Sequence, residues 1–249
     1  MEKPAIKLTD VTAGYAGNPV QNHVSFEVHR GEIVALLGGS GCGKSTMLKT
    51  MIGLLPAIDG DIELDGESII HCDQLTKRKI LRKIGVAFQN GALFRSYTLA
   101  ENIALPLQEY TDYSEEEIRE IVAEKLRIVG LENAGEKMPL DLSGGMVKRG
   151  AVARALALDP GIIFLDEPSA GLDPLNSANL DKLILEIRDK FNAAIMIVTH
   201  ELDSIFTVAD RVIFLDSSGK GILAEGSPAE LRDHCKDPFI HSFLNRGKV

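Results

Sequence analysis

The chain has 249 residues, of which 45% are hydrophobic and 25% charged, and its formal net charge is −9. This length and ordinary globular composition allow one large domain or two small ones with a sizeable core. The negative charge argues against a dedicated nucleic-acid binder, and no apolar run approaches the roughly 20 residues of a membrane span.

The cysteine content and the first residues indicate the cellular compartment. Cys42, Cys72 and Cys235 form neither a CxxC pair nor an even disulfide set. The first residues, Met-Glu-Lys-Pro-Ala, lack the long apolar core of a signal peptide. We therefore expect a protein of the reducing cytoplasm.

The first 37 residues indicate β-structure. Apolar and polar residues alternate over 6–8 and again over 24–28, which is typical of half-buried strands. Residues 33–37, Ile-Val-Ala-Leu-Leu, are continuously apolar. That run predicts a buried strand of a parallel sheet.

A glycine-rich stretch, GGSGCGKST, follows at residues 38–46. It fits the pattern G-x-x-x-x-G-K-[ST] and precedes a helical apolar pattern over 46–55. Glycines let backbone N–H groups approach a polyphosphate, and the dipole of the following helix favours the anion. Lys44 can reach the β- and γ-phosphates, and the Ser45 hydroxyl can bind Mg²⁺. A glycine turn with an exposed lysine is the alternative, and the strand–loop–helix context favours phosphate binding. The residues expected at the phosphates are Gly38, Gly39, Ser40, Gly41, Cys42, Gly43, Lys44, Ser45 and Thr46.

The remaining chain alternates between strand and helix patterns. We expect strands over 59–66, 162–165 and 194–198, helices over 114–130, 146–158 and 180–191, and a hairpin over 212–215 and 222–224 turning at Ser218-Gly219. This alternation predicts an α/β fold with a mostly parallel sheet. Residues 90–160 lack strong strand signals, which indicates an inserted helical subdomain.

Two acidic residues end the apolar stretch Ile-Ile-Phe-Leu-Asp-Glu at 162–167. Ligands bind at the carboxyl ends of parallel strands, so both carboxylates are expected at a site. Asp166 is placed to hold Mg²⁺, and Glu167 can polarise a water molecule that attacks a γ-phosphate. Two acids at a strand end are common without function, but the phosphate loop in the same chain favours catalysis.

A third motif, Leu-Ser-Gly-Gly-Met, occupies residues 142–146 just before an alanine-rich helix. Ser143, Gly144 and Gly145 at a helix N-terminus make a second anion site. The motif alone is weak, but it stands about 20 residues before Asp166-Glu167, and together these motifs resemble the ATP-binding-cassette (ABC) ATPase family over nearly the whole chain. LSGG is similar to the signature motif of that family.

This resemblance implies roles for four further positions. Tyr15 is similar to the aromatic residue that stacks on adenine, and Gln89 to the glutamine that contacts Mg²⁺ and water and senses the transporter. The loop Ser169–Asp173 resembles the one that links the two active sites of a dimer, with Asp173 near the nucleotide. His200 resembles the histidine that contacts the γ-phosphate. Each residue alone is more often structural, and the order of the motifs supports the functional interpretation.

The resemblance also implies an architecture and partners. It predicts a P-loop NTPase (RecA-like) core with an N-terminal antiparallel β subdomain and a helical signature subdomain over about 90–160, all within one domain of 1–249. ATP and Mg²⁺ would lie between the phosphate loop of one subunit and the signature motif of the other. We expect a homodimer attached to separate integral membrane permease subunits, without nucleic acid, at the cytoplasmic face of the inner (plasma) membrane.

Two short motifs indicate a branch of the family. Met146 replaces the glutamine found after LSGG in many relatives, and Gly-Ala-Leu-Phe follows the Gln89 loop at 91–94. Both features resemble the ATPase of Mla-type lipid transporters, which implies phospholipid transport between bacterial membranes and a mammalian-cell-entry (MCE) type lipid-binding partner. The alternatives are an amino-acid or other small-solute importer and a soluble ABC protein acting on DNA or ribosomes. A P-loop kinase would leave LSGG without a purpose.

Two further expectations concern single side chains. Phe94 is expected on an exposed bend that receives a short permease helix, with Leu99 in the core. Cys42 lies in the phosphate loop, where the helix N-terminus and Lys44 favour a thiolate. We expect its alkylation to inhibit the ATPase and ATP to slow its labelling.

Overall fold

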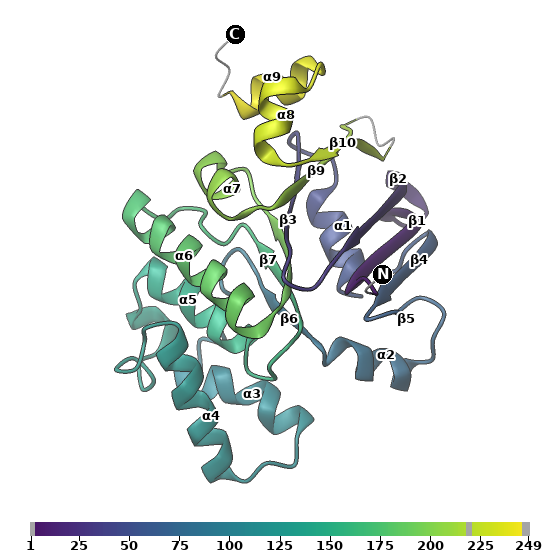
Figure 1. Ribbon diagram of the computed structural model, residues 1–249. Helices are drawn as coiled ribbons and strands as arrows, with labels where there is room; N and C mark the ends of the chain where they lie inside the picture. The colour runs from purple at the N-terminus through teal and green to yellow at the C-terminus, as the bar shows by residue number, and fades with distance from the viewer. Residues whose placement is uncertain (1–2, 218–220, 246–249) are drawn as a thin grey trace.

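The computed structural model of the chain describes residues 3–217 and 221–245 (Figure 1). Its strands are β1 (Ile6–Tyr15), β2 (Asn18–Val28), β3 (Ile33–Gly38), β4 (Asp59–Leu64), β5 (Glu67–Ser68), β6 (Ile84–Ala87), β7 (Ile162–Asp166), β8 (Ala194–Val198), β9 (Arg211–Leu215) and β10 (Ile222–Gly226). Its helices are α1 (Lys44–Met51), α2 (Gln74–Leu81), α3 (Leu99–Tyr110), α4 (Glu115–Ile128), the 3₁₀ turn η1 (Pro139–Asp141), α5 (Gly144–Ala155), α6 (Pro174–Phe191), α7 (Leu202–Val208), α8 (Pro228–His234) and α9 (Pro238–Leu244).

The central sheet of the described chain has the strand order β10-β9-β3-β8-β7-β6. All neighbours from β9 to β6 are parallel, and β10 returns antiparallel beside β9. Parallel strands end at one shared edge of the sheet, the edge where ligands bind in such folds. The residues that follow Gly38, Ala87, Asp166 and Val198 therefore leave the sheet on the same side.

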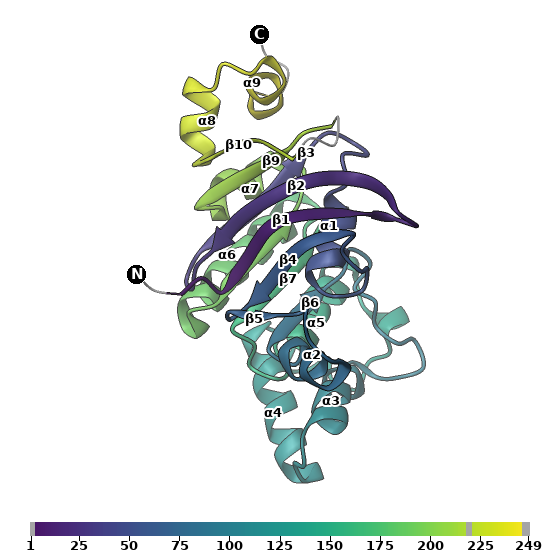
Figure 2. The ribbon, with the colours of Figure 1, turned by 90° about the vertical axis from the view of Figure 1, so that its right-hand side faces the viewer.

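A second sheet, with the order β2-β1-β4-β5, is entirely antiparallel (Figure 2). Its pairing aligns Ile6 with Val28 and Leu8 with Phe26, so the alternating apolar residues share one face. Helix α1 packs between this sheet and the central sheet, with contacts to β1, β3, β7 and β8. Met47, Leu48 and Met51 of α1 are buried in the core that the two sheets share.

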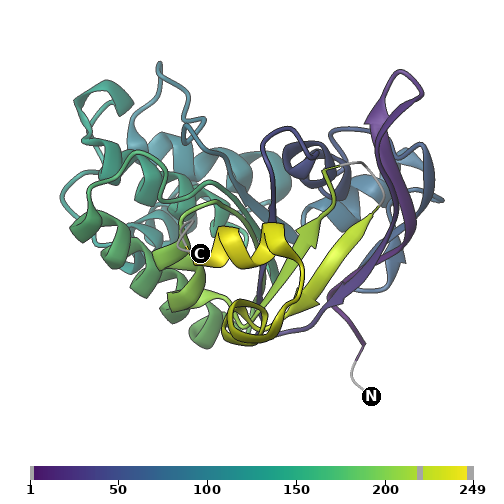
Figure 3. The same cartoon turned by 90° about the horizontal axis from the view of Figure 1, so that it is seen from above.

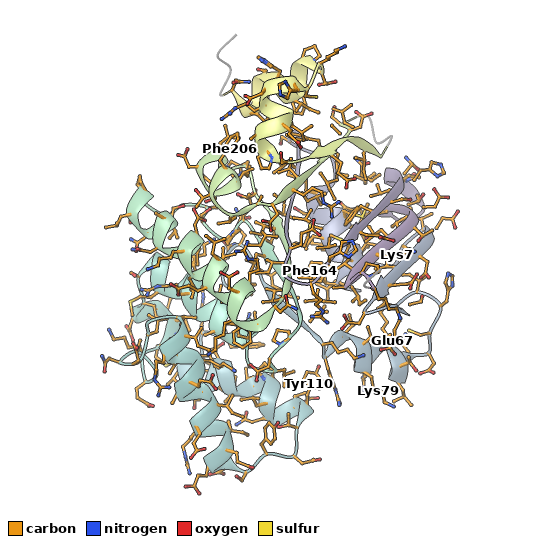
Figure 4. All side chains as sticks on the ribbon, in the orientation of Figure 1. Lys7, Glu67, Lys79, Tyr110, Phe164 and Phe206 are labelled. Carbon is orange, nitrogen blue, oxygen red and sulfur yellow. The ribbon has the colours of Figure 1, made fainter. Side chains whose placement is uncertain are left out.

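The central sheet is covered on both faces, as strand β8 illustrates. Ile195 and Ile197 face the core formed with helices α3 to α6, whereas Met196 and Val198 face α1 and the antiparallel sheet. Every β8 residue is buried, which explains its continuous apolar run. Figure 4 shows Phe164 of β7 in the middle of the molecule, where it is completely buried.

The α/β fold with an antiparallel N-terminal sheet is confirmed, and the predicted elements are largely present. The expected helix over 114–130 is α4, and its capping box is formed: Ser114 Oγ accepts from the Glu117 N–H, and the Glu117 carboxylate accepts from the Ser114 N–H. Strands β9 and β10 form the expected antiparallel pair. The turn predicted at Ser218-Gly219 lies outside the described residues.

Several predicted boundaries were wrong for local reasons. Helix α1 runs over 44–51 rather than 46–55, because the chain turns left-handed at Gly53, with φ of 73°. The strand expected over 59–66 is a hairpin of β4 and β5 that turns at Asp65-Gly66. Helix α5 occupies 144–155 instead of 146–158, and α6 begins at Pro174, directly after its N-cap Asp173, instead of at 180.

Several short elements were not predicted: α2, β6, α3 and α7 to α9. Strand β6 has only four residues and depends on its neighbour α5. A Cβ added to Gly85 would lie 2.3 Å from the Ala155 carbonyl oxygen, so glycine is required for α5 to approach the strand. This packing is not visible in the local sequence pattern.

Residues 90–160 contain α3, α4, η1 and α5 and no strand. Helices α3 and α4 lie at the lower end of Figure 1, while α5 packs on both α3 and β6. Among the helices of residues 3–217 and 221–245, none combines the length and apolar character needed to cross a bilayer. Seen from above, the C-terminal helices α8 and α9 lie close to the ends of β9 and β10 (Figure 3).

Candidate functional site

The glycine-rich loop joins buried β3 to α1 in a conformation that only glycine adopts readily. Gly38, Gly41 and Gly43 have φ values of 147°, 77° and 98°, in the left-handed region that other residues avoid. A Cβ at Gly43 would lie 2.7 Å from Val20 Cγ1. Gly43 also caps α1 without any side-chain hydrogen bond to the first N–H groups, which leaves those donors available to an anion.

Lys44 places its ammonium on this loop. Its Nζ donates to the carbonyl oxygens of Gly38, at 2.8 Å, and Gly39, at 3.1 Å. The ammonium charge therefore lies beside the N-terminus of α1, where it adds to the positive end of the helix dipole. Ser45 is exposed in the first turn of α1, whereas Thr46 is buried.

Gln21 supports the phosphate loop through buried hydrogen bonds, and this role was not predicted from the sequence. Its side chain is completely buried, and its Nε2 donates to the carbonyl oxygens of Cys42 and Asp216, each at 2.7 Å. Gln21 and Val20 belong to the β1–β2 hairpin that also carries Tyr15. Tyr15 is 48% exposed near the tip of this hairpin, and a ring that is exposed on both faces can stack on a base.

Cys42 corrects an expectation from the sequence. The left-handed turns at Gly41 and Gly43 rotate its side chain under the loop, where it is 2% exposed and belongs to the core beneath α1. An added Cβ at Gly38 would lie 2.5 Å from its Sγ. The thiol is therefore buried beneath the loop, 3.9 Å from Lys44 Nζ, and this burial argues against the reactivity expected from the sequence.

We expect a maleimide to label Cys42 slowly, at a rate that ATP does not change, because the thiol must first be exposed by local opening. Cys72 and Cys235 are half-buried and serve as internal references that label faster. Peptide mass spectrometry after timed labelling measures all three rates. Rapid labelling of Cys42 that ATP slows would instead restore the original expectation.

Asp166, Glu167 and His200 converge at the carboxyl ends of β7 and β8. Glu167 Oε1 lies 2.8 Å from His200 Nδ1. Glu167 Oε2 is buried and has no hydrogen-bond partner within the described residues, so it can accept a hydrogen bond from a substrate water. The carboxylate is thus oriented by the histidine on one oxygen and available on the other.

Burial and then the adjacent Glu167 carboxylate raise the pKa of Asp166. Two neighbouring, partly desolvated carboxylates favour a nearby cation. Within the described residues, His, Cys, Asp and Glu side chains nowhere form a group of three that could hold a metal by themselves. The adjacent carboxylates of Asp166 and Glu167 could hold Mg²⁺ bound with phosphate, since Mg²⁺ takes few protein ligands and keeps water and phosphate oxygens. Ser45, Gln89 and Asp166 are the residues that can supply those ligands.

Gln89 lies two residues beyond β6 and is exposed. The bend that follows it, residues 91–98, is clamped from two helices. Asn102 of α3 is completely buried, and its amide donates to the carbonyl oxygens of Phe94, Tyr97 and Thr98. Arg154 of α5 donates to those of Gly91 and Ala92. Neither clamp was predicted from the sequence.

The bend displays the side chains expected there. Phe94 is 56% exposed, and its ring packs edge-on against that of Tyr97 at 6.0 Å. Leu93 is half-buried against the core, and Leu99 is fully buried. The predicted division into an exposed Phe94 and a core Leu99 is therefore confirmed.

Ser143 is the N-cap of α5, accepting from the Met146 N–H at 3.3 Å, and both Ser143 and Gly144 are exposed. The motif packs on the first turn of α6: a Cβ at Gly145 would lie 3.3 Å from Asn176 Oδ1. Helix α5 covers one face of the central sheet and α1 the other. The phosphate loop and the LSGG motif of one chain thus belong to different layers of the molecule.

Asp173 has a structural part in this region. Its carboxylate caps α6, accepting from the N–H groups of Leu175 and Asn176 and from the Asn176 side chain. These hydrogen bonds, those of Asn176 first, lower the pKa of Asp173. Its predicted contact with nucleotide stays a prediction.

A buried polar group lies behind the Ser169–Asp173 loop. Ser204 Oγ of α7 donates to Asp181 Oδ2 of α6 at 2.9 Å and lies 3.4 Å from Ser169 Oγ. Asp181 is 5% exposed. Burial raises the pKa of Asp181, opposed by the Ser204 hydrogen bond and aided by Glu201 and Asp203.

We expect Asp181→Asn to raise the melting temperature at pH 7, because the amide keeps an acceptor for Ser204 and removes a buried charge. A raised pKa means that the folded state binds the proton more tightly, so stability falls as pH rises from about 4 through the folded pKa. The advantage of the variant should therefore shrink toward pH 4. Melting curves of both proteins from pH 4 to 8 test this, and a variant that is less stable at pH 7 would contradict it.

Comparison with known proteins identifies the family. The family model described as "ABC transporter" matches residues 21–170, which include the phosphate loop, LSGGM and Asp166-Glu167. The chain is 42% identical over 245 residues to the "Probable ribonucleotide transport ATP-binding protein mkl" of Mycobacterium leprae, covering 98% of this chain and 70% of that protein. The chain belongs to the ABC transporter family.

Other similar proteins agree with this assignment. The ABC ATPase described here is 35% identical over 240 residues to the "Intermembrane phospholipid transport system ATP-binding protein MlaF" of Escherichia coli K12, covering 96% of this chain and 88% of that protein. The corresponding protein of Haemophilus influenzae is 34% identical over 231 residues, covering 93% of this chain and 87% of that protein. The predicted resemblance to the family is confirmed.

Solved structures confirm the fold. The structure of cbiO1 from Clostridium perfringens, part of the ABC transporter complex cbiONQ, has a TM-score of 0.84 at 29% identity and covers 94% of this chain and 92% of its own. A dimeric post-hydrolysis state of the ATP-binding cassette MJ0796 bound to ADP and Pi has a TM-score of 0.81 at 32% identity, covering 89% of this chain and 98% of that chain. The chain is an ABC-type ATPase and an ATP-binding subunit of a transporter.

Proposed function

We propose that this ABC ATPase works as a homodimer that binds two ATP molecules between its subunits and powers phospholipid transport through a separate permease. The arrangement of the site supports the proposed homodimer with two shared ATP sites. The phosphate loop and the LSGG motif each stand at a helix N-terminus, a position that favours anions, yet they lie on different layers of one chain. A second copy, as in the dimeric MJ0796 structures, would supply the missing half of each site.

The residues at the edge of the central sheet then take complementary parts. Residues 38–46 would bind the phosphates, with Tyr15 against adenine and Ser143, Gly144 and Gly145 of the partner copy at the γ-phosphate. Glu167 would accept the proton of the attacking water through its unpaired Oε2, and His200 would hold Oε1 and approach the γ-phosphate. Closing and opening of the dimer with ATP binding and hydrolysis would supply the mechanical step.

Mg²⁺ bound with ATP would neutralise the developing charge on the phosphates. Ser45, Gln89 and Asp166 would hold it, which fits the two adjacent carboxylates of Asp166 and Glu167, because each raises the cost of leaving the other charged without a cation. In the free protein, partial burial makes the ionised carboxylate of Asp166 energetically costly. Such a cost is expected of a residue whose role is to bind a cation.

The substrate is proposed from relatives and from the bend. MlaF proteins are described as phospholipid transport ATPases, and residues 91–94 and Met146 carry the motifs that resemble that branch. We infer an MCE-type protein as a further subunit and a position at the cytoplasmic face of the inner membrane. Ribonucleotide transport is the second candidate, because relatives at 42% identity are described that way.

The exposed Phe94 and the clamped bend would receive a helix of the permease. Clamping by Asn102 and Arg154 fixes the backbone under the ring, so docking there costs little ordering entropy. Because Gln89 precedes the same bend, a shift of the docked helix would reach the nucleotide site. We regard residues 1–249 as one nucleotide-binding domain in which about 90–160 form the permease-facing helical part.

The substrate is tested by reconstitution. The chain is purified in complex with its permease and the proposed MCE-type subunit and placed in liposomes with fluorescent phospholipid. We expect ATP-dependent transfer of phospholipid between donor and acceptor vesicles, and no transfer with ADP. ATP-dependent uptake of labelled ribonucleotide without lipid transfer would instead select the second candidate.

A further inference from the structure

Lys148 of α5 joins three segments that carry site residues. Its Nζ donates to the main-chain oxygen of Glu167 at 2.8 Å and also to the main-chain oxygen of Gln89. These acceptors follow β7 and β6, while Lys148 itself lies five residues after Ser143 on the helix that begins with the LSGG motif. One partly buried ammonium therefore links the main chain of the glutamine loop, the main chain at Glu167 and the signature helix.

The acceptor at Glu167 lies in a strained part of the chain. Glu167 has φ of 46°, a left-handed conformation that non-glycine residues adopt only when their surroundings hold them there. Its N–H donates to Val198 O at 2.7 Å, and its carbonyl accepts from Lys148. The side chain that starts from this peptide places Oε1 against His200 Nδ1 and leaves Oε2 buried without a hydrogen-bond partner in the described structure.

The neighbouring basic residues of α5 do not share this geometry. Arg149 donates to the carbonyl oxygens of Val129 and Gly130 at the end of α4. Arg154 donates to those of Gly91 and Ala92 in the bend. Arg149 thus fastens α5 to the end of α4, and Arg154 fastens it to the bend. Lys148 alone among these three bonds to the residue that orients the attacking water.

We propose that Lys148 is a positioning residue that fixes the Glu167 peptide and the Gln89 loop to the signature helix. The proposal rests on the function proposed above, because the roles of Glu167 and Gln89 come from it. It adds a connection between sites: the helix that would present LSGG to the partner's nucleotide also holds the catalytic carboxylate of its own chain. A movement of α5 on ATP binding in one site is thereby passed to the other.

The test compares Lys148→Ala in two backgrounds. In the wild-type chain, the loss should lower kcat for ATP by ~10–100-fold, the scale of a catalytic group displaced by about 1 Å. KM for ATP should change little, because the phosphate loop is untouched. In the Glu167→Gln background the same change should lower residual turnover by a clearly smaller factor, because the carboxylate that Lys148 positions is already removed and only the effect on the Gln89 loop remains.

Two further variants distinguish positioning from general stability. Lys148→Arg should recover much of the turnover, since a guanidinium can also donate to two carbonyl oxygens. Lys182→Ala on α6 removes an exposed lysine and should change neither kcat nor the melting temperature. Thermal melting of Lys148→Ala should stay within a few degrees of wild type.

The outcomes separate this proposal from the proposed function. If Glu167→Gln abolishes turnover but Lys148→Ala is as active as wild type, the positioning role is wrong and the ATPase assignment stands. An equal loss from Lys148→Ala in both backgrounds would also overturn it. If Glu167→Gln itself turns over normally, the proposed catalytic role fails, and the Lys148 proposal fails with it.

Discussion

Replacing Glu167 by glutamine is expected to lower ATP turnover by ~10²–10⁴-fold, the contribution of a general base or water-orienting group. The amide keeps the size of the side chain and leaves residues 38–46 unchanged, so ATP should still bind. Because hydrolysis no longer separates the subunits, ATP should hold the variant as a dimer. Phosphate release and sedimentation with and without ATP measure both effects.

Glu201 provides the matched control for that change. It lies on the other side of His200, with its Oε1 4.0 Å from His200 Nε2, and is 44% exposed. Glu201→Gln removes the same charge close to the site but should retain turnover of the same order as wild type. Turnover near wild type in Glu167→Gln, or an equal loss in Glu201→Gln, would remove Glu167 from its assigned role.

Replacing Phe94 by alanine is expected to weaken association with the permease by ~30-fold or more, because truncating a large aromatic anchor typically costs about 2 kcal/mol or more. The ring is more than half exposed, and Asn102 and Arg154 hold the backbone beneath it. Nucleotide binding and thermal melting of the isolated subunit should therefore change little. Co-purification with the permease, beside a nucleotide-binding assay and a melt, tests all three.

Phe206→Ala is the matched control for Phe94→Ala. Phe206 is a partly exposed phenylalanine of α7, far from α3 and α4 in Figure 4. We expect it to leave the complex with the permease intact. If Phe94→Ala instead melts several degrees lower while the complex stays intact, Phe94 supports the core and this account of coupling is wrong.

The sequence predicted the phosphate loop and the Asp166-Glu167 pair well because their signals are local. A strand, its terminal residues and the following turn lie within about ten positions, so spacing alone places them. The same holds for the capping box of α4. The signature motif was recognisable only through its distance from Glu167 and through family resemblance, since a capped glycine pair is common.

The supporting residues could not be predicted because their partners are distant in sequence. Gln21 bonds to Asp216, 195 positions away, and Lys148 bonds to Gln89, 59 positions away. A lone glutamine or a lysine near a signature motif carries no periodicity that would indicate such contacts. The burial of Cys42 was missed for a related reason: it lies between two left-handed glycines whose φ values the pattern does not specify.

The claim that ATP binds between subunits is tested most directly with mixed dimers of two variants. Lys44→Ala disables the phosphate loop, and Ser143→Arg blocks the signature motif. In a dimer of one Lys44→Ala chain and one Ser143→Arg chain, both defects fall in the same shared site, and the other site is intact. In a dimer of wild type and a chain carrying both changes, each site has one defect. The account predicts clear ATPase activity in the first mixture and almost none in the second, whereas equal activity in the two, or more in the second, would contradict it.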